Sequence, residues 1–295
     1  MKDFLRRFFV KTVKFMSRGW GLSRFAPVAW VYGLLYSPLK SKGGLADVSI
    51  PGVGNLKFAL DEKDSLGLSV FGIYEEYETS LFVREIKPGG VVVDAGANIG
   101  YYTVIASRLT GENGRVYAFE PDPVNFGILK KNVEQNGCKN VILENKALSD
   151  KNGTINLYVS GENMGDHRIY DSGDGRKSVP AQAIRLDDYL GDVADKVNLL
   201  KMDVQGAEIM VLRGAERVLG GSGELKIFSE FWPFAMKRAG ENPKDFFEIL
   251  GKKGFAVSDI SATKSAVEPI QDTKRFADIH SGEKDGGANI FAEKK

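Results

Sequence analysis

Hydrophobic and polar positions alternate along the chain in segments that suit buried strands and amphipathic helices in turn. Short apolar runs rich in β-branched residues are bounded by glycine, proline, asparagine or aspartate, which is typical of strands in a parallel sheet. Longer stretches between them carry apolar positions at helical spacing. The predicted strands are 91–94, 116–119, 141–145, 197–202, 225–229, 255–259 and 288–291, and the predicted helices are 101–109, 124–135, 208–219 and 243–253.

This order predicts a doubly wound α/β sheet with helices on both faces. A hairpin-like stretch over 48–58 and a helix ending near Ile86 precede the first strand of the sheet. With 295 residues, 43% of them hydrophobic, the chain can bury one α/β core and a modest extension. We therefore divide it into an extension, 1–44, and a main domain, 45–295, with its core at 88–295.

The first strand ends on an acidic residue and runs into a glycine-bounded turn. The segment VVVDAGANIG puts Asp94 at the strand end and Gly96, Asn98 and Gly100 in the turn before a helix. Glycine leaves room for a nucleoside to lie against bare backbone, and the helix start offers unpaired N–H groups. Asp94 is placed either to order the turn or to accept a hydrogen bond from a ligand amine.

A second acidic residue follows the next strand, in VYAFEPD. When ionised, Glu120 can accept hydrogen bonds from both hydroxyls of a ribose, each contributing roughly 1.5 to 3 kcal/mol. Gly96 and Gly100 are four positions apart, whereas a pyrophosphate site needs G-x-G-x-x-G. The pattern therefore predicts a nucleoside ligand without phosphates. Ala147, just past the third strand, either borders the base or is ordinary packing.

A long polar segment precedes the fourth strand of the sheet. Two alternating stretches, 154–159 and 179–184, flank SGENMGDHR and a Gly/Asp-rich continuation. Because long loops in compact domains are usually functional or disordered, we expect a lid or a substrate loop here. The segment contains His167, which is either a base suited to neutral pH or a solvated side chain.

The first 44 residues differ from the rest. On a helical wheel, apolar side chains including Phe8 and Phe9 fall on one side and basic ones including Lys11 and Lys14 on the other. This predicts a basic amphipathic helix that suits an anionic membrane surface through residues 2–39. The uncharged run 25–39 is too short to span a bilayer. Packing on the main domain, contact with another subunit, and an export signal are the alternatives.

Composition excludes several kinds of site. With one cysteine and two histidines, the chain can build neither a disulfide framework nor a cysteine/histidine zinc site, and we predict no metal. Residues 1–44 carry nine Lys or Arg and one acid, whereas the rest has 31 basic and 38 acidic residues. A mildly acidic main domain argues against nucleic acid as a partner, since phosphate binding needs a basic face.

Six segments of the chain, in order, carry a family resemblance. They are VVVDAGANIGYYTVIA, GRVYAFEPDPVNFGILKKNVEQNG, NVILENKALSD, IRLDDYL, NLLKMDVQGAEIMVLRGA and the strand end SEFWP, and the match runs from about Tyr74 to the C-terminus. With these segments the chain resembles the FkbM family of S-adenosylmethionine-dependent O-methyltransferases. That family usually reads D-V-E-G-A-E where this chain has Gln205 at the third position, in DVQGAE.

The resemblance implies a class I methyltransferase fold, Rossmann-like, with a seven-stranded sheet. It implies S-adenosylmethionine as cofactor and a hydroxyl of a saccharide, glycolipid or secondary metabolite as methyl acceptor. It also places Asp203 beside the methyl donor. The candidate cofactor-binding residues are Asp94, Gly96, Asn98, Gly100, Glu120, Ala147 and Asp203.

Methyl transfer to a hydroxyl needs alignment of donor and acceptor and a group that takes the hydroxyl proton. The candidates for this base are Asp203, Glu230 and His167. Asp203 suits a positioning role equally well, and Glu230 could instead cap the turn that follows it. We expect Lys201 to point to the opposite face from Asp203 and to pair with a helix carboxylate.

Two functions from other classes stay open. An NAD-linked oxidoreductase would share the strand, turn, helix and acidic residue, and a non-catalytic membrane adaptor with a vestigial nucleoside pocket is favoured by Gln205. The expected partners are a small-molecule, glycan or lipid-linked substrate and an anionic membrane surface, with an oligomer as an option. We expect a cytoplasmic protein at the inner membrane face.

Overall fold

A computed structural model describes residues 44–161, 163–221, 223–281 and 287–294 of the chain. The predicted basic helix and the uncharged run 25–39 lie outside these residues. Within the described ranges, no helix combines the length and the apolar character needed to cross a membrane.

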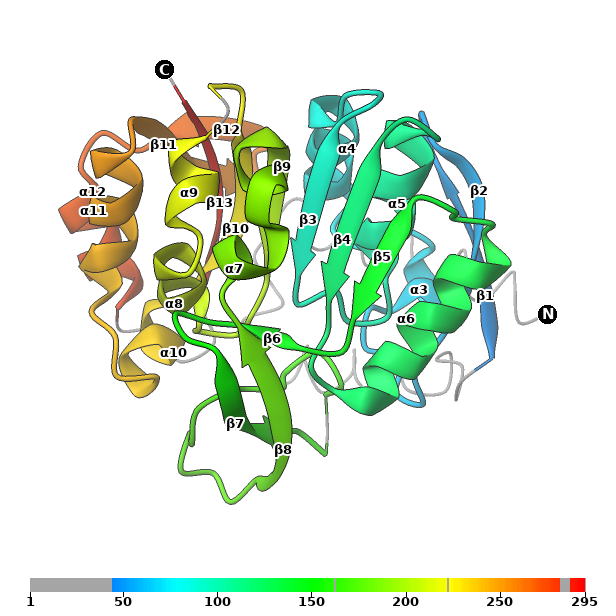
Figure 1. The fold of residues 1–295 in the computed structure, drawn as a ribbon, viewed down its shortest axis with the longest axis horizontal. Coiled ribbons are helices and arrows are strands. Elements are labelled where there is room, and N and C mark those ends of the chain that lie inside the picture. Colours follow the sequence, from blue (N-terminus) through cyan, green and yellow to red (C-terminus); the bar gives the residue numbers. More distant parts are fainter. Residues whose placement is uncertain (1–43, 162, 222, 282–286, 295) are drawn as a thin grey trace.

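The centre of the molecule is an eight-stranded sheet in the order β12-β11-β13-β10-β9-β3-β4-β5 (Figure 1). Strands β10, β9, β3, β4 and β5 are parallel, whereas β13 is antiparallel to both of its neighbours. The strands are β3 (Val91–Ala95), β4 (Arg115–Phe119), β5 (Val141–Glu144), β9 (Val197–Met202), β10 (Lys226–Phe231), β11 (Phe255–Ser261), β12 (Ala266–Pro269) and β13 (Ala288–Lys294).

Neighbouring residues of the strands face opposite sides of the sheet, as the twofold strand repeat requires. Val93 and Leu200 belong to one core cluster, and Val92 and Leu199 belong to the other. The first cluster is covered by α7 (Leu186–Leu190), α8 (Glu208–Arg213), α9 (Glu216–Gly220), α11 (Pro243–Lys252) and α12 (Thr273–His280). The second is covered by α4 (Glu76–Glu85), α5 (Tyr101–Thr110) and α6 (Pro123–Gln135), together with β1 (Leu45–Ile50), β2 (Gly54–Ala59) and α3 (Leu68–Phe71).

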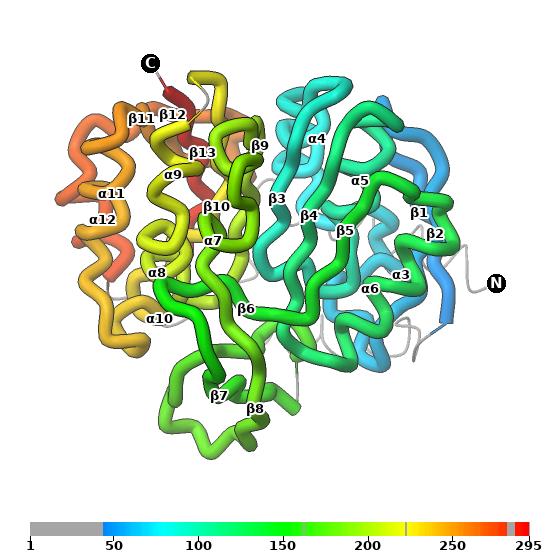
Figure 2. The backbone as a smooth tube through the Cα atoms, in the orientation of Figure 1, coloured from blue at the N-terminus to red at the C-terminus, as the bar shows by residue number. Residues whose placement is uncertain are grey.

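The β1–β2 hairpin and the α11–α12 pair lie at opposite ends of the molecule (Figure 2). The hairpin predicted over 48–58 is present, because β1 and β2 pair antiparallel. The helix predicted to end near Ile86 is α4. Both elements precede the first strand of the sheet in the chain. Their buried side chains belong to the second core cluster, on one face of the sheet.

The polar segment before β9 builds a second, small sheet in the order β6-β8-β7. It projects beyond the edge of the large sheet at which β3, β4 and β5 end (Figure 1). Its strands are β6 (Ala147–Leu148), β7 (Gly153–Val159) and β8 (Lys177–Ile184), and the 3₁₀ helix η3 (Gly191–Lys196) follows α7. The expected loop between β7 and β8 thus lies near the carboxyl ends of β3, β4 and β5, the edge of the sheet at which ligands of α/β folds bind.

The structure corrects the predicted elements at three points. The seven predicted strands are present, and β12 adds an eighth at the edge, paired with β11. The single helix predicted over 208–219 is two helices, because Asp187 takes the hydrogen bonds of a continuous helix: its amide donates to the Gly214 carbonyl and its carboxylate accepts from the amides of Arg217 and Val218. The sequence pattern did not predict α3 or α12, although Asp272 caps α12 by accepting a hydrogen bond from the Arg275 amide, and the turn or helix expected after Glu230 is the helix α10 (Pro233–Arg238).

Candidate active site

The turn after β3 is held close to the ends of two neighbouring strands. The amides of Gly96 and Ala97 donate to the Phe119 carbonyl at 3.0 and 2.9 Å. Gly96 has φ +74°, and a Cβ there would lie 2.0 Å from the carbonyl oxygen of Asp203. Glycine at 96 therefore allows the chain to pass between β4 and β9. Gly100, at φ +88°, starts α5 and packs against Leu129.

Glu120 follows β4 and is 5% exposed. One carboxylate oxygen accepts a hydrogen bond from the Asn98 amide at 2.8 Å, and the other accepts from the Asp122 amide at 2.9 Å. Burial raises the pKa of Glu120 to about 8, against the lowering effect of these two hydrogen bonds. The carboxylate is therefore fixed in orientation and retains lone pairs for a ligand.

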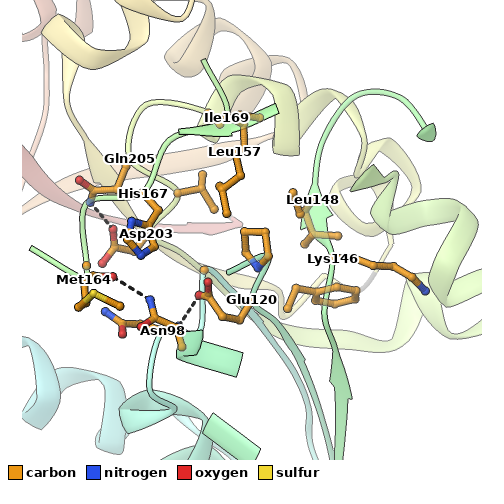
Figure 3. Close-up of a pocket in the computed structure, with 18 residues that line it drawn as sticks. Asn98, Glu120, Lys146, Leu148, Leu157, Met164, His167, Ile169, Asp203 and Gln205 are labelled. Atoms are coloured by element: carbon orange, nitrogen blue, oxygen red, sulfur yellow. Dashed lines mark hydrogen bonds between the residues drawn. The ribbon is translucent and has the colours of Figure 1, made fainter. Parts of the chain in front are cut away.

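Glu120 lies inside a pocket of about 570 Å³, which we call the apolar pocket. In Figure 3, Asn98, Asp203 and Gln205 stand on one side of Glu120, and Lys146 and Leu148 stand on the other. Other side chains of its wall are Phe119, Ala147, Leu157, Met164, His167 and Ile169.

The loop between β7 and β8 closes one side of the apolar pocket. The Asn125 side chain, on α6, donates to the Met164 carbonyl at 2.7 Å and holds the loop against the domain. His167 has a side chain only 5% exposed, so the solvated alternative is wrong. Its Nδ1 accepts from the Ser160 amide at 3.0 Å, which leaves the neutral ring no free lone pair, and burial lowers its pKa. This arrangement disfavours His167 as a base.

Asp94 and Lys201 form a buried charge cluster beneath the turn. Asp94 accepts a hydrogen bond from the Thr103 hydroxyl at 2.6 Å and does not line the apolar pocket. The Lys201 ammonium lies 3.8 Å from Asp94 and 3.7 Å from Asp203. Although burial lowers the pKa of Lys201, Asp203 and Asp94 raise it overall. Of the two roles considered for Asp94, the geometry favours ordering of the turn.

The expected direction of Lys201 is wrong. Residues two apart on an extended chain face the same side, and the Lys201 ammonium accordingly lies 3.7 Å from the Asp203 carboxylate. The nearest partners of Lys201 are Asp94 and Asp203 at strand ends, and the expected helix carboxylate is present as a weaker influence, because Glu78 of α4 also raises the pKa of Lys201.

A second pocket, of about 850 Å³, adjoins the first, and we call it the polar pocket. It shares Asn98, Gly165, Asp203 and Gln205 with the apolar pocket. A group bound in one pocket can therefore reach a group bound in the other. The rest of its lining is Ser65, Leu66, Tyr74, Asn163, Asp166, Glu230, Trp232 and Gly287.

Two carboxylates of the polar pocket are joined by one amide. The Gln205 side-chain nitrogen donates to Asp203 at 2.7 Å and to Glu230 at 3.0 Å (Figure 3 shows the first of these). Burial, and then the charge of Asp203, raise the pKa of Glu230 well above its ordinary value. A carboxylate with a raised pKa is a suitable acceptor for a proton near neutral pH.

Comparison with known proteins identifies the family. The model of the methyltransferase FkbM domain matches residues 94–279. The chain belongs to the FkbM methyltransferase family. This confirms the family resemblance, the class I methyltransferase fold and S-adenosylmethionine as the cofactor of the family. It also disfavours the NAD-linked alternative.

Several curated relatives are similar to this chain. Methyltransferase 1 of Beauveria bassiana is 32% identical over 42% of this chain and 58% of its own length. Hexuronic acid methyltransferase AglP of Haloferax volcanii is 30% identical over 58% and 66%. The 31-O-demethyl-FK506 methyltransferase FkbM of Streptomyces tacrolimicus is 28% identical over 45% and 62%. The chain thus spans about three fifths of the length of these relatives.

The residues present fit the cofactor of the FkbM family. Glu120 is the carboxylate in the apolar pocket that can hold a ribose, and Ala147 with Leu148 gives an apolar surface for the adenine. Gly96 keeps the floor free of a side chain. Among the described residues, the buried Oδ1 atoms of Asn98 and Asn125 have no hydrogen-bond partner. They are acceptors available to a polar ligand.

The structure brings most predicted residues of the FkbM site together. Gly96, Asn98, Glu120, Ala147, His167 and Asp203 line the apolar pocket, and Asp203 and Glu230 line the polar one. Asp94 and Gly100 support the turn from behind. The sequence analysis missed the contributions of Tyr74, Asn125, Asn163 and Trp232. Asn125 had a detectable signal, since it is a polar residue on the buried face of an amphipathic helix.

Proposed function

We propose that this chain is an S-adenosylmethionine-dependent O-methyltransferase that methylates a hydroxyl of a saccharide, glycolipid or secondary metabolite. The observation that carries the proposal is the pair of adjoining pockets with Asp203 at their junction. Relatives whose names specify a hexuronic acid, a 2-O position and the FK506 macrolide support a hydroxyl acceptor.

The cofactor would occupy the apolar pocket, with its ribose hydroxyls on Glu120 and its adenine near Ala147 and Leu148. When bound, it supplies an electrophilic methyl group. The glycine turn and the lid loop, held by the Asn125–Met164 hydrogen bond, would orient the nucleoside and exclude water.

The acceptor would occupy the polar pocket. The rings of Tyr74 and Trp232 offer faces for a sugar, and Asp203 and Glu230 can accept hydrogen bonds from hydroxyls. We assign the base to Glu230, because its raised pKa suits removal of a proton near neutral pH. Asp203 would position the hydroxyl beside the methyl donor.

Labelled transfer tests this function. Purified protein is incubated with methyl-tritiated S-adenosylmethionine and with glycan and lipid extracts of the host. We expect label in an alkali-stable ether and a roughly hundredfold slower transfer by Glu230→Gln, the loss typical of a missing general base. Label in ester or amine products, or none in any fraction, would contradict the proposal.

We also infer that residues 2–39 bring the protein to an anionic membrane at the cytoplasmic face. The support is the basic amphipathic pattern of the sequence. The intact protein should sediment with vesicles that contain phosphatidylglycerol, and a chain lacking residues 1–39 should stay in the supernatant. Equal sedimentation of both forms would contradict this inference.

A further inference from the structure

The Gln205 side chain is fixed between two carboxylates that face the polar pocket. Its Nε2 carries two hydrogens and has two carboxylate acceptors, Asp203 at 2.7 Å and Glu230 at 3.0 Å. The backbone holds the residue in place, because its φ is +53° and its carbonyl accepts from the Tyr170 hydroxyl at 2.9 Å. The Gln205 amide therefore joins the carboxyl groups of Asp203 and Glu230, at the ends of β9 and β10, and we call this arrangement the amide bridge.

The turn that carries Gln205 is restrained at the next residue, Gly206. Gly206 has φ +102°, and a Cβ there would lie 2.8 Å from the backbone carbon of Ala235. The Glu208 carboxylate accepts from the amides of Val204 and Gly206 at 3.2 and 3.3 Å. The turn that carries Gln205 is thus held from both sides, so its side chain projects toward Asp203 and Glu230 in one orientation.

The charges around this bridge are mostly negative. The Lys201 ammonium lies 3.7 Å from Oδ2 of Asp203, whereas the Gln205 amide donates to Oδ1. The charges of Asp203, Glu208 and Glu75 disfavour ionisation of Glu230, and Lys201 favours it. The Gln205 amide is a neutral donor, so it gives both carboxyl groups a hydrogen-bond partner without adding another negative charge between them.

A glutamate at this position would change that balance. The family usually has D-V-E-G-A-E at this turn, and a glutamate would put an oxygen where the Gln205 nitrogen now lies. Three carboxylates would then meet within hydrogen-bond distance, and they could be accommodated only by taking up at least one proton. Glutamine removes this need for an additional proton.

We propose that Gln205 is a positioning residue that holds the side chains of Asp203 and Glu230 together, so that both face the hydroxyl of the methyl acceptor. The proposal rests on the proposed function. Its consequence is that base catalysis by this chain extends to lower pH than it would with glutamate at the same position.

Three variants test the bridge. Gln205→Glu keeps the size and adds the carboxylate, Gln205→Leu removes both donors, and Gln182→Glu makes the same chemical change at an exposed position of β8. Thermal unfolding is followed from pH 5 to 9. We expect Gln205→Glu to lose thermal stability relative to wild type as the pH rises, because its extra proton must leave, and Gln182→Glu to follow wild type.

The same variants are assayed for labelled transfer to the host extract. For Gln205→Glu, we expect the pH of half-maximal transfer to rise by about one unit, as for a carboxylate beside a like charge. For Gln205→Leu, we expect two unequal losses: the factor by which kcat falls should be at least roughly ten times the factor by which the affinity for 5′-methylthioadenosine falls. The reason is that a positioning defect acts on the chemical step.

Two results separate the possible failures. If Gln205→Glu matches wild type in both the pH dependence of unfolding and the pH profile of transfer, the bridge does not exist in solution and the proposal is overturned. If wild type transfers no label to any fraction, the proposed function fails and the catalytic role of Gln205 fails with it. The unfolding curves would still report whether the amide joins the carboxylates.

Discussion

The apolar pocket is lined mainly by hydrophobic side chains around one buried carboxylate, Glu120, whereas the polar pocket beside it has three carboxylates, two aromatic rings and several amides. The core of the first comes from two short motifs at the ends of β3 and β4. The second collects residues from Ser65 to Gly287. The residues around Glu120 therefore follow from two neighbouring strand ends, whereas the polar pocket depends on segments that lie far apart in the sequence.

The largest effect is expected from the buried charge cluster that supports Asp203, the carboxylate that lines both pockets. Lys201→Met keeps the length of the side chain and leaves Asp94 and Asp203 without their common cation. Because an uncompensated buried charge is strongly unfavourable, we expect a loss of about 3 to 5 kcal/mol in the free energy of unfolding, measured by urea denaturation. The exposed Lys151→Met should change it by less than about 0.5 kcal/mol. A loss below about 1 kcal/mol for Lys201→Met would contradict the buried cluster.

Gly96→Ala should damage the floor of the apolar pocket itself. The new Cβ meets the Asp203 carbonyl at 2.0 Å, and φ +74° strains alanine, so we expect a loss of about 3 kcal/mol in unfolding free energy. Calorimetry should also show an affinity for 5′-methylthioadenosine lower by more than roughly tenfold. Gly127→Ala, on an exposed turn of α6 with open space around its Cβ, should stabilise the protein by about 0.5 to 1 kcal/mol. Near-normal nucleoside affinity in Gly96→Ala would show that the turn is not the floor.

Glu120→Gln should affect the apolar pocket and spare the polar one. The amide cannot accept from both the Asn98 and Asp122 N–H groups while also accepting two ribose hydroxyls. We expect the affinity for 5′-methylthioadenosine to fall roughly 10- to 100-fold in calorimetry, because charge-assisted hydrogen bonds are lost. Glu134→Gln, an exposed change on α6, serves as the control. Affinity of Glu120→Gln within about twofold of wild type would remove Glu120 from the ribose site.

The pH dependence of nucleoside binding gives the smallest and most specific effect. Since the pKa of Glu120 is raised to about 8 in the folded free protein, this group holds a proton between its ordinary pKa and pH 8. The contribution of Glu120 to the unfolding free energy of the ligand-free protein therefore decreases as the pH rises from its ordinary pKa to about 8. A ligand that needs the carboxylate ionised should bind up to roughly tenfold more tightly per pH unit below pH 8, with a plateau above it. Glu120→Gln should show no such rise, and a flat profile in wild type would contradict the assignment.

The sequence carried much of the fold and of the cofactor half of the site. Strand β9 was predicted with its observed bounds, because its apolar run is bounded by polar residues on both sides. Asp94 to Gly100 and Glu120 were identifiable because each lies at the end of a strand with a strong local pattern. Adjacent parallel strands then bring them to one edge without further information.

Other features depend on contacts that no local pattern records. The break at Gly214 follows from hydrogen bonds to Asp187, a residue in a distant segment of the chain. Tyr74 and Trp232 read as ordinary aromatic residues and become pocket walls only after folding. The direction of Lys201 was recoverable from the twofold strand repeat, so that error lay in the interpretation and not in the sequence.

The close approach of Gly96 to the Asp203 carbonyl also has a thermodynamic consequence. A ligand that displaces the β3 turn by a few tenths of an ångström must displace the backbone of Asp203 with it. Occupancy of one pocket would then alter affinity in the other, and linkage requires the effect to be equal in both directions. If the affinity of each pocket is measured with the other pocket empty and then occupied, the affinity should change by the same factor in both cases.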